Sequence, residues 1–192
     1  MKPDRRRLRA ARAAFVSGLA GPVRAGLERA LAARVLPHLG PPAILGTHAA
    51  IGDEIDPAAL EAAAVAAGWR LAFPRVEGDA PLAFHLASRA DLRPGFRGIP
   101  EPPTDAPRIR PTVLLVPMLA ADRAGNRIGQ GGGLYDRTLA HVRAAGPITA
   151  IGLAWDMQLV EPLAPDPWDQ PLDAIATPTV FHRAAPAATP PA

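Results

Sequence analysis

A glycine-rich stretch, residues 129–133, has the residue types best suited to chemistry, with Arg127 before it and Asp136 after it. Glycines allow a backbone to approach a phosphate closely, and the first N–H groups of a helix have no partner inside the helix. The forked guanidinium of Arg127 suits phosphate oxygens. A carboxylate repels a phosphate unless a cation lies between them, so Asp136 indicates Mg²⁺ bridging to the phosphates. The alternative is a tight turn in which Asp136 only favours the N-terminus of a helix.

Two better-known glycine motifs do not fit this stretch. A Walker loop needs Gly-Lys-Ser or Gly-Lys-Thr, and the only lysine of the chain is Lys2. The dinucleotide pattern Gly-x-Gly-x-x-Gly would begin at Gly129 and would need a third glycine at position 134, which is Leu134. The stretch is therefore a third kind of loop.

The elements around the glycines are predicted from hydrophobic spacing. Residues 113–116 form a short apolar run closed by Pro117, which is typical of a buried parallel strand. Behind the glycines, Tyr135, Leu139 and Val142 fall at i, i+4 and i+7, so they share one face of a helix. The chemistry would thus lie between the end of a strand and the start of a helix.

Strand and helix patterns alternate along the rest of the chain. We expect strands at 43–48, 69–73, 81–87 and 148–154, a helix from 21 to about 37, and a helix at 56–67 with Asp56 as N-cap and Pro57 at its first position. Residues 91–110 are rich in Pro and Gly and are predicted to be a long loop. This alternation predicts a mostly parallel sheet with helices on both faces. We expect one domain over 1–183, followed by a disordered Pro/Ala tail at 184–192.

Composition excludes several classes of protein. The 192 residues are 48% hydrophobic and 20% charged, which is ordinary for a globular domain. The net charge is only +3, and basic and aromatic residues do not interleave, so we expect no nucleic-acid partner. The chain has no cysteine, which excludes disulfides and cysteine-based zinc sites. No run is long and apolar enough to span a membrane, so we expect no membrane partner.

The N-terminal segment is basic and is predicted to be helical. Leu8, Ala11 and Phe15 form one stripe of that helix, and three arginines, Arg5, Arg9 and Arg12, form another. One interpretation is a solvated basic face. The other is a cluster of cations that binds a phosphate group.

The segment Arg127-Ile-Gly-Gln-Gly-Gly-Gly-Leu-Tyr-Asp-Arg137 resembles the signature of 5-formyltetrahydrofolate cyclo-ligases, also called methenyltetrahydrofolate synthetases. The resemblance extends to the N-terminal helix, to residues 52–55 and 100–102, and to residues 151–177. It implies a three-layer α/β sandwich with a mostly parallel sheet, like that of ribose-phosphate isomerases and glucosamine-phosphate deaminases. The implied reaction is the ATP- and Mg²⁺-dependent conversion of 5-formyltetrahydrofolate to 5,10-methenyltetrahydrofolate, with release of ADP and phosphate.

The same resemblance implies roles for individual residues. Arg127 and Asp136 would be catalytic, Glu54 would contact the folate, and Asp136 and Asp169 would bind Mg²⁺. The residues implied to contact ATP are Arg5, Arg9, Arg127, Gly129, Gln130, Gly131, Gly132, Gly133 and Tyr135. Phe84 and His85 are either part of a pterin pocket or, as we favour, ordinary strand residues. His48 is expected to be a packed or surface histidine and not a ligand.

Four positions depart from the family pattern. Arg5 replaces a lysine, Ala121 a phenylalanine, Leu134 a tyrosine and Trp168 a histidine. These departures keep open the alternative of a non-catalytic member of the same fold that binds a nucleotide or a folate. A sugar-phosphate isomerase is a weaker alternative, because nothing in the sequence supplies its acid or base. For the enzyme we expect a cytoplasmic monomer.

Overall fold

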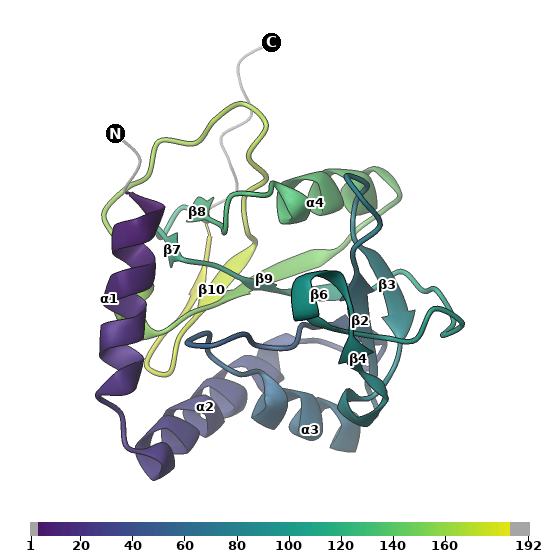
Figure 1. Cartoon of the computed structure of the whole chain (residues 1–192), viewed down its shortest axis with the longest axis horizontal. Coiled ribbons are helices and arrows are strands. Elements are labelled where there is room, and N and C mark those ends of the chain that lie inside the picture. The colour runs from purple at the N-terminus through teal and green to yellow at the C-terminus, as the bar shows by residue number, and fades with distance from the viewer. Residues whose placement is uncertain (1–3, 185–192) are drawn as a thin grey trace.

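A seven-stranded sheet forms the centre of the computed structural model, which describes residues 4–184 (Figure 1). Its strand order is β11-β10-β9-β6-β1-β2-β3, and the five inner strands are parallel. The edge strands β3 and β11 run antiparallel to their neighbours. The strands are β1 (Ile44–Gly46), β2 (Arg70–Arg75), β3 (Ala83–Leu86), β6 (Val113–Pro117), β9 (Thr149–Leu153), β10 (Ala174–Ala176) and β11 (Phe181–Arg183).

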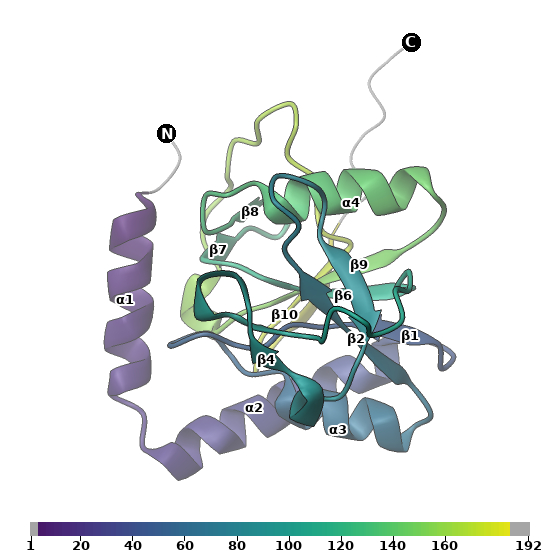
Figure 2. The same ribbon diagram turned by 45° about the vertical axis from the view of Figure 1, so that its right-hand side comes forward.

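Helices cover both faces of this sheet. The helices α2 (Gly21–Val35) and α3 (Ala58–Ala66) lie on one face and α4 (Leu134–Ala144) lies on the other, as Figures 1 and 2 both show. The helix α1 (Arg5–Ser17) stands beside the sheet and packs Phe15 against Trp155, with 5.8 Å between the ring centroids. The predicted three-layer α/β fold with a mostly parallel sheet is confirmed. Its likeness to isomerase and deaminase folds stays a prediction, as does the single domain over 1–183.

The central strand β6 has the burial that its sequence predicts. Val113 and Leu115 pack into the cluster on the α2 and α3 side, whereas Leu114 and Val116 pack into the cluster on the α4 side. All four side chains are buried, because the strand lies between β1 and β9 and has a helical layer on each face. An apolar run without alternation is therefore explained by burial on two sides.

The boundaries near α3 differ from the prediction by one position. The helix begins at Ala58 with Pro57 as N-cap, although the carboxylate of Asp56 accepts a hydrogen bond from the Ala58 N–H at 3.0 Å. Asp56 thus satisfies one of the free N–H groups at the helix start, as its residue type predicts. The assignment of Pro57 to the first helical position was wrong, within the usual uncertainty of helix ends.

The long loop predicted at 91–110 contains short regular elements that were not predicted. This segment contains the hairpin of β4 (Arg93–Pro94) and β5 (Pro100–Glu101), with the 3-10 turn η3 (Phe96–Gly98) at its tip. Glu101 is buried and accepts a hydrogen bond from the Val76 N–H at 3.1 Å, so the hairpin is fixed to the end of β2. Such a long-range contact leaves no periodic signal in the sequence.

The remaining short elements connect the main ones. They are the hairpin of β7 (Ala120–Ala121) and β8 (Arg127–Ile128) and the 3-10 turns η1 (Leu36–His38), η2 (Arg89–Asp91) and η4 (Asp156–Gln158). The strand β11 was not predicted. Ala184 donates a backbone hydrogen bond to Asp173, and residues 185–192 of the predicted tail lie outside the described residues.

Candidate active site

The chain reverses its direction of travel across the sheet between β1 and β6. From β1 it passes through α3 to β2 on one side, whereas from β6 it passes through α4 to β9 on the other. The carboxyl ends of two such neighbouring strands open a crevice, which is where open α/β sheets bind ligands. The sheet topology alone therefore points to the ends of β1 and β6.

A cavity of about 730 Å³ lies at this place. One part of its wall follows β1 and β2, and another part follows β6 and includes the glycine loop, which we define as residues 129–133. A third part comes from the connection between β9 and β10. The cavity lining includes Arg5, His48, Glu54, Pro74, Val76, Ile99, Glu101, Arg127, Gly129, Gln130, Gly131, Gly132, Gly133, Tyr135, Asp136, Trp168 and Asp169.

The glycine loop turns the chain from β8 into α4. Gly131 has φ +108° and Gly133 has φ +62°, which are left-handed values that favour glycine. Gly133 is the N-cap of α4, and no side chain caps this helix. Since Gly132, Gly133 and Leu134 line the cavity, the helix start presents its first N–H groups there, which is a suitable site for an anion.

Arg127 and Asp136 form an ion pair at the edge of the glycine loop. The distance from Arg127 Nη2 to Asp136 Oδ1 is 2.6 Å, and Arg127 also donates to the Gln170 carbonyl. The side chain of Arg127 is only 4% exposed, and burial lowers its pKa against the opposing effect of Asp136 and Asp169. Arg127 is therefore a cation that orients Asp136 and the segment after Asp169.

Asp136 and Asp169 are the two carboxylates for which the family resemblance implies Mg²⁺ binding, and this role stays a prediction. Both line the cavity, and both act electrostatically on Arg127. Asp136 Oδ1 accepts from Arg127 and from the Gln170 N–H at 3.1 Å, whereas Oδ2 accepts no hydrogen bond from any residue within 4–184. The same described part of the chain contains no cluster of three or more His, Cys, Asp or Glu that could bind a metal ion. Mg²⁺ typically takes one or two carboxylates and completes its shell with phosphate oxygens and water, so two carboxylates suffice.

The three arginines of α1 contact three different parts of the site. Arg5 Nε donates to the Gly129 carbonyl at 3.2 Å, and Arg9 donates both to the side-chain oxygen and to the carbonyl of Gln130, each at 2.9 Å. Arg12 is buried outside the cavity lining, where it donates to the Met118 carbonyl at 3.3 Å. The stripe predicted from the sequence exists, but it does not face one common anion.

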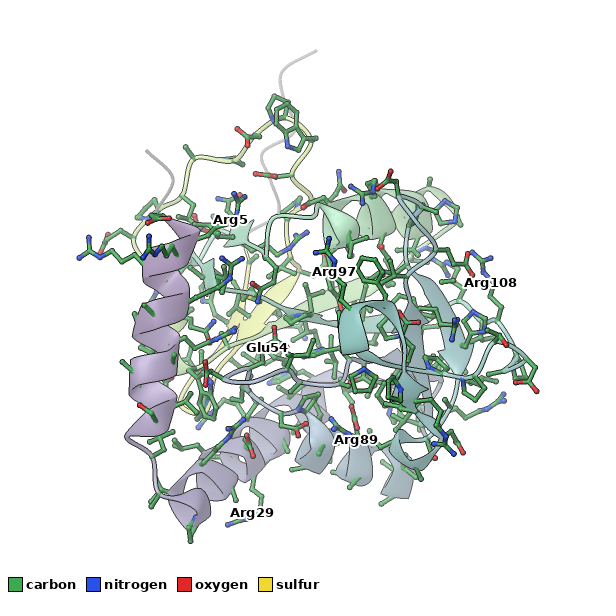
Figure 3. All side chains as sticks on the ribbon, viewed as in Figure 1. Arg5, Arg29, Glu54, Arg89, Arg97 and Arg108 are labelled. Carbon is green, nitrogen blue, oxygen red and sulfur yellow. The ribbon has the colours of Figure 1, made fainter. Side chains whose placement is uncertain are left out.

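Glu54 lies on the wall that follows β1, and in the view of Figure 3 its label stands between α1 and the sheet. It is 8% exposed, and its oxygens accept from the Ile51 N–H at 3.0 Å and from Gln130 Nε2 at 3.2 Å. Arg12 Nη1 lies 3.9 Å from Glu54 Oε1. Glu54 is thus oriented by the first helix and by the glycine loop together.

Several other side chains named in the sequence have clear places. Tyr135 lines the cavity, and burial raises its pKa well above the usual value for a phenol. Phe84 is buried in the core, and His85 Nδ1 lies 2.6 Å from the Ala106 carbonyl. Neither Phe84 nor His85 lines the cavity, which favours the interpretation as ordinary strand residues. His48 is buried at the cavity wall, as expected of a packed histidine.

Sequence reasoning assigned no role to two further residues that shape the site. Asp122 is buried and accepts hydrogen bonds from the N–H groups of Ala124, Asn126 and Leu163. It therefore joins the β7–β8 hairpin to the segment that leads to Asp169. Gln170 contributes its backbone carbonyl to Arg127 and its backbone N–H to Asp136. An Asp followed by Asn four residues later signals a local turn, but a backbone contact such as that of Gln170 has no sequence signal.

The fold and this site define a class of protein: an α/β protein with a cavity at the reversal point of its sheet, lined by a glycine loop and the start of a helix. A family model described as the 5-formyltetrahydrofolate cyclo-ligase family matches residues 3–178, and the chain belongs to that family.

Individual relatives agree with this assignment. The chain is 45% identical over 73 residues to the 5-formyltetrahydrofolate cyclo-ligase of Escherichia coli K12 and 39% identical over 85 residues to that of Mycolicibacterium smegmatis. The aligned stretches cover 38% and 44% of this chain, and they span only 40% and 43% of the two relatives. The sequence similarity to these relatives thus concerns less than half of their length.

Two solved structures are similar over nearly their whole length. The NMR structure of Aquifex aeolicus 5,10-methenyltetrahydrofolate synthetase matches with a TM-score of 0.76 and 25% identity, covering 98% of this chain and 96% of that one. A 5,10-methenyltetrahydrofolate synthetase from Mycoplasma pneumoniae matches with a TM-score of 0.69 and 21% identity, covering 92% and 99%. The second match concerns the fold alone. Within residues 4–184, no helix has the length and apolar character needed to cross a membrane.

Proposed function

We propose that this chain is a ligase that uses ATP and Mg²⁺ to convert 5-formyltetrahydrofolate to 5,10-methenyltetrahydrofolate, releasing ADP and phosphate. The observation that supports this most is a single cavity with two kinds of wall. One wall has an uncapped helix start, glycines and two carboxylates, and the other has a buried glutamate among apolar residues. A reaction between a nucleotide and an organic substrate requires the two ligands to lie next to each other, so their binding walls must face the same cavity.

The nucleotide belongs on the wall made by the glycine loop and α4. The N–H groups at the start of α4 would bind phosphate oxygens, and Arg5 and Arg9 lie close enough to add positive charge, because they already contact Gly129 and Gln130. Asp136 and Asp169 would bind Mg²⁺, which when bound neutralises phosphate charge and aligns the terminal phosphoryl group for transfer. Arg127 would keep Asp136 oriented for this task.

The folate belongs on the wall that follows β1 and β2. Glu54 is the only carboxylate that the described structure places directly after β1 in the cavity lining, and it suits the polar N–H edge of a pterin. Apolar contact would come from Pro74, Val76 and Ile99, which line the same wall. We therefore assign Glu54 to substrate orientation.

The chemistry explains the need for ATP. A formyl oxygen bound to the carbon on N5 is a poor leaving group, so the γ-phosphoryl group is first transferred to it and ADP leaves. The N10 nitrogen then attacks the formyl carbon, loses its proton, and the carbon–oxygen bond breaks to release phosphate. The protein acts by positioning and by stabilising charge in a site shielded from water, with no covalent bond to the substrate.

The test is to mix the purified protein with ATP, Mg²⁺ and 5-formyltetrahydrofolate and to follow the near-ultraviolet absorbance of the methenyl product. One ADP should appear for each product molecule, and omission of folate should stop ADP formation. ATP or folate binding without product would favour the non-catalytic member of the fold, and a protein that binds neither ATP nor 5-formyltetrahydrofolate would contradict both. Action as a monomer in the cytoplasm stays a prediction, which size-exclusion chromatography and fractionation of cells would check.

A further inference from the structure

Trp168 is exposed in a way that the other two tryptophans are not. Its exposed fraction is 69%, against 4% for Trp69 and 0% for Trp155, and it is the most exposed of the large apolar side chains within residues 4–184. Trp168 also lines the cavity, next to Asp166 and Asp169. An indole that faces both solvent and a ligand cavity is placed to contact a ligand, because leaving so large an apolar surface in water is unfavourable.

The backbone around Trp168 is anchored at both ends. The Asp169 N–H donates to the Asp166 carbonyl at 3.0 Å, and the Asp166 N–H donates to the Asp169 carboxylate at 2.9 Å, which closes a tight turn. Two residues after Trp168, the backbone of Gln170 is bonded to Arg127 and to Asp136. Trp168 therefore projects from a turn that is tied to the phosphate-binding wall.

The sheet order indicates which end of the nucleotide lies near Trp168. The loop with Trp168 connects β9 to β10, and in Figures 1 and 2 this yellow-green segment arches over β8 near the start of α4. The wall with Glu54 and Val76 follows β1 and β2, and the glycine loop follows β6, which lies between these two halves of the sheet. Phosphoryl transfer to a folate on the Glu54 wall requires the terminal phosphate of ATP to point toward that wall. The nucleoside end of ATP then lies on the opposite side of the glycine loop, near Trp168.

We infer that Trp168 forms the base subsite of the nucleotide site, stacking its indole on the purine ring of ATP. This inference rests on the proposed function of the same cavity and adds the position of the base to it. Stacking suits an exposed aromatic side chain because every purine has a flat face, and the contact removes apolar surface of both rings from water. Arg5 lies in the same lining and donates a hydrogen bond to the Gly129 carbonyl of the glycine loop.

The test uses two ligands with a chain of three phosphoryl groups, of which only the first carries a nucleoside: a non-hydrolysable ATP analogue and inorganic tripolyphosphate, each with Mg²⁺. Trp168→Ala should raise the calorimetric Kd of the ATP analogue by roughly 5- to 150-fold, the range expected for loss of one stacked base. The Kd of tripolyphosphate should stay unchanged, and Trp168→Phe should restore most of the affinity for the analogue.

Fluorescence gives a second readout that does not depend on activity. Because Trp69 and Trp155 are buried, Trp168 should supply nearly all of the emission that iodide quenches in the wild-type protein. The ATP analogue should protect this emission from iodide, whereas tripolyphosphate should not. Trp168→Phe should abolish the protected component, which assigns the signal to this residue.

Several outcomes would overturn the inference. Equal loss of affinity for the analogue and for tripolyphosphate would show that Trp168 acts on the loop or the phosphates. Protection by 5-formyltetrahydrofolate and not by the analogue would place the indole against the folate. If the wild type forms methenyl product and Trp168→Ala binds the analogue normally, this inference alone fails. If the wild type binds no nucleotide, the proposed function fails with it.

Discussion

Single residues of the site depend on their partners for orientation. Arg127 is nearly buried, and a buried guanidinium needs a carboxylate and hydrogen-bond acceptors close by, which Asp136 and the Gln170 carbonyl provide. Asp136 in turn uses only Oδ1 for contacts with residues in the described range 4–184. A carboxylate with this arrangement is pre-oriented for a ligand at its second oxygen.

The first prediction concerns the metal role of Asp136. Asp136→Asn keeps the size of the side chain and an acceptor for Arg127, but it removes the charge that attracts Mg²⁺. Binding of the ATP analogue with Mg²⁺ should weaken by about tenfold or more, whereas binding without metal should change little. Calorimetry in the presence and absence of Mg²⁺ measures both. Equal weakening under the two conditions would contradict a bridging metal, and circular dichroism checks the fold.

The second prediction concerns the pH dependence of stability. Burial lowers the pKa of His48 below its usual 6.5, against the opposing effects of Glu54 and Asp56, while Arg89 lowers it further. The folded state then binds the proton less readily than the unfolded chain. The free energy of unfolding should therefore fall as the pH falls below about 6.5, by at most about 1.4 kcal/mol per pH unit from this one group.

Urea unfolding between pH 7.5 and 5.5 tests this, with His48→Gln compared against the wild type. The variant should lose less stability over this range. Glu61, whose pKa burial raises, is present in both proteins, so the difference isolates His48. The exposed histidine of α4 provides the matched control, His141→Gln, which should follow the wild type. Parallel curves for wild type and His48→Gln would refute the effect.

At the scale of elements, α1 joins the site mainly through arginine side chains. Arg5 and Arg9 reach backbone carbonyls of the glycine loop, and Arg12 reaches the end of β6. Gly129 has no side chain that could shield its carbonyl from Arg5, and Gln130 offers Arg9 both its carbonyl and its side-chain oxygen. The helix thus fixes the loop in the free protein and places two positive charges at its edge.

The third prediction tests those two charges. Arg5→Ala and Arg9→Ala should each raise the ATP KM by roughly ten- to a hundredfold, because a charge-assisted contact contributes about 1.5–3 kcal/mol. Arg7 lies on the same helix, is exposed and does not line the cavity, so Arg7→Ala is the matched control and should leave KM unchanged. If all three variants behave alike, the stripe is only a solvated face.

The fourth prediction compares two glycines of the loop. At Gly131 the φ of +108° is strained for any residue with a Cβ, although the added atom would meet only Arg5 at 3.8 Å. Gly131→Ala should lower the free energy of unfolding by about 1–3 kcal/mol through the backbone alone. Gly129 has no positive φ and open space around it, so Gly129→Ala should change it by less than about 0.5 kcal/mol. Equal costs would contradict the assigned loop conformation.

At the scale of the whole molecule, Gln130 connects the two walls of the cavity. Its side-chain oxygen accepts from Arg9 and its amide donates to Glu54, residues that we assign to the nucleotide and to the folate. A ligand that binds Arg9 or Glu54 must first break the hydrogen bonds of Gln130. The second ligand then binds without the free-energy cost of breaking them. Each ligand should therefore bind more tightly when the other is present.

The fifth prediction measures this coupling. In the wild type, the Kd of the ATP analogue should fall by about fivefold or more when 5-formyltetrahydrofolate is present. Gln130→Met keeps the length of the side chain without its polar atoms and should remove most of that difference. Gln170→Met is the matched control, because the contacts of Gln170 with Arg127 and Asp136 use its backbone. Coupling that persists in Gln130→Met would exclude the bridge as its cause.

Much of the fold follows from patterns that are local in the chain. The apolar run of β6, the period of α4 and the acidic residue before α3 each appear within a few positions of the element they define. The glycine loop is of the same kind, because left-handed φ values at Gly131 and Gly133 require glycine. These features were accessible because sterics and hydrophobic periodicity act over short distances.

The strand predictions that failed concern very short strands, which pair with neighbours only a few positions away in the chain. The hairpin of β4 and β5 looked like a loop, since its strands are two residues each and its anchor, Glu101, bonds to the end of β2. The strand β11 was missed for a similar reason, because an edge strand of three residues has little periodicity. A strand of two or three residues is too short to show alternation, so its existence depends on packing against the rest of the structure.

The residue types of the site could thus be predicted from the sequence, whereas their spatial arrangement depends on contacts between residues far apart in the chain. Glycines, Arg127 and Asp136 indicated a phosphate and a metal without any coordinates. Only the tertiary structure shows that Arg12 lies beside Glu54 and that Arg127 is buried. The same is true of the hydrogen bond by which Gln130 joins the two walls of the cavity. The physical reason is separation: Arg5 contacts Gly129 across 124 positions, and only packing of the layers determines which of such pairs meet.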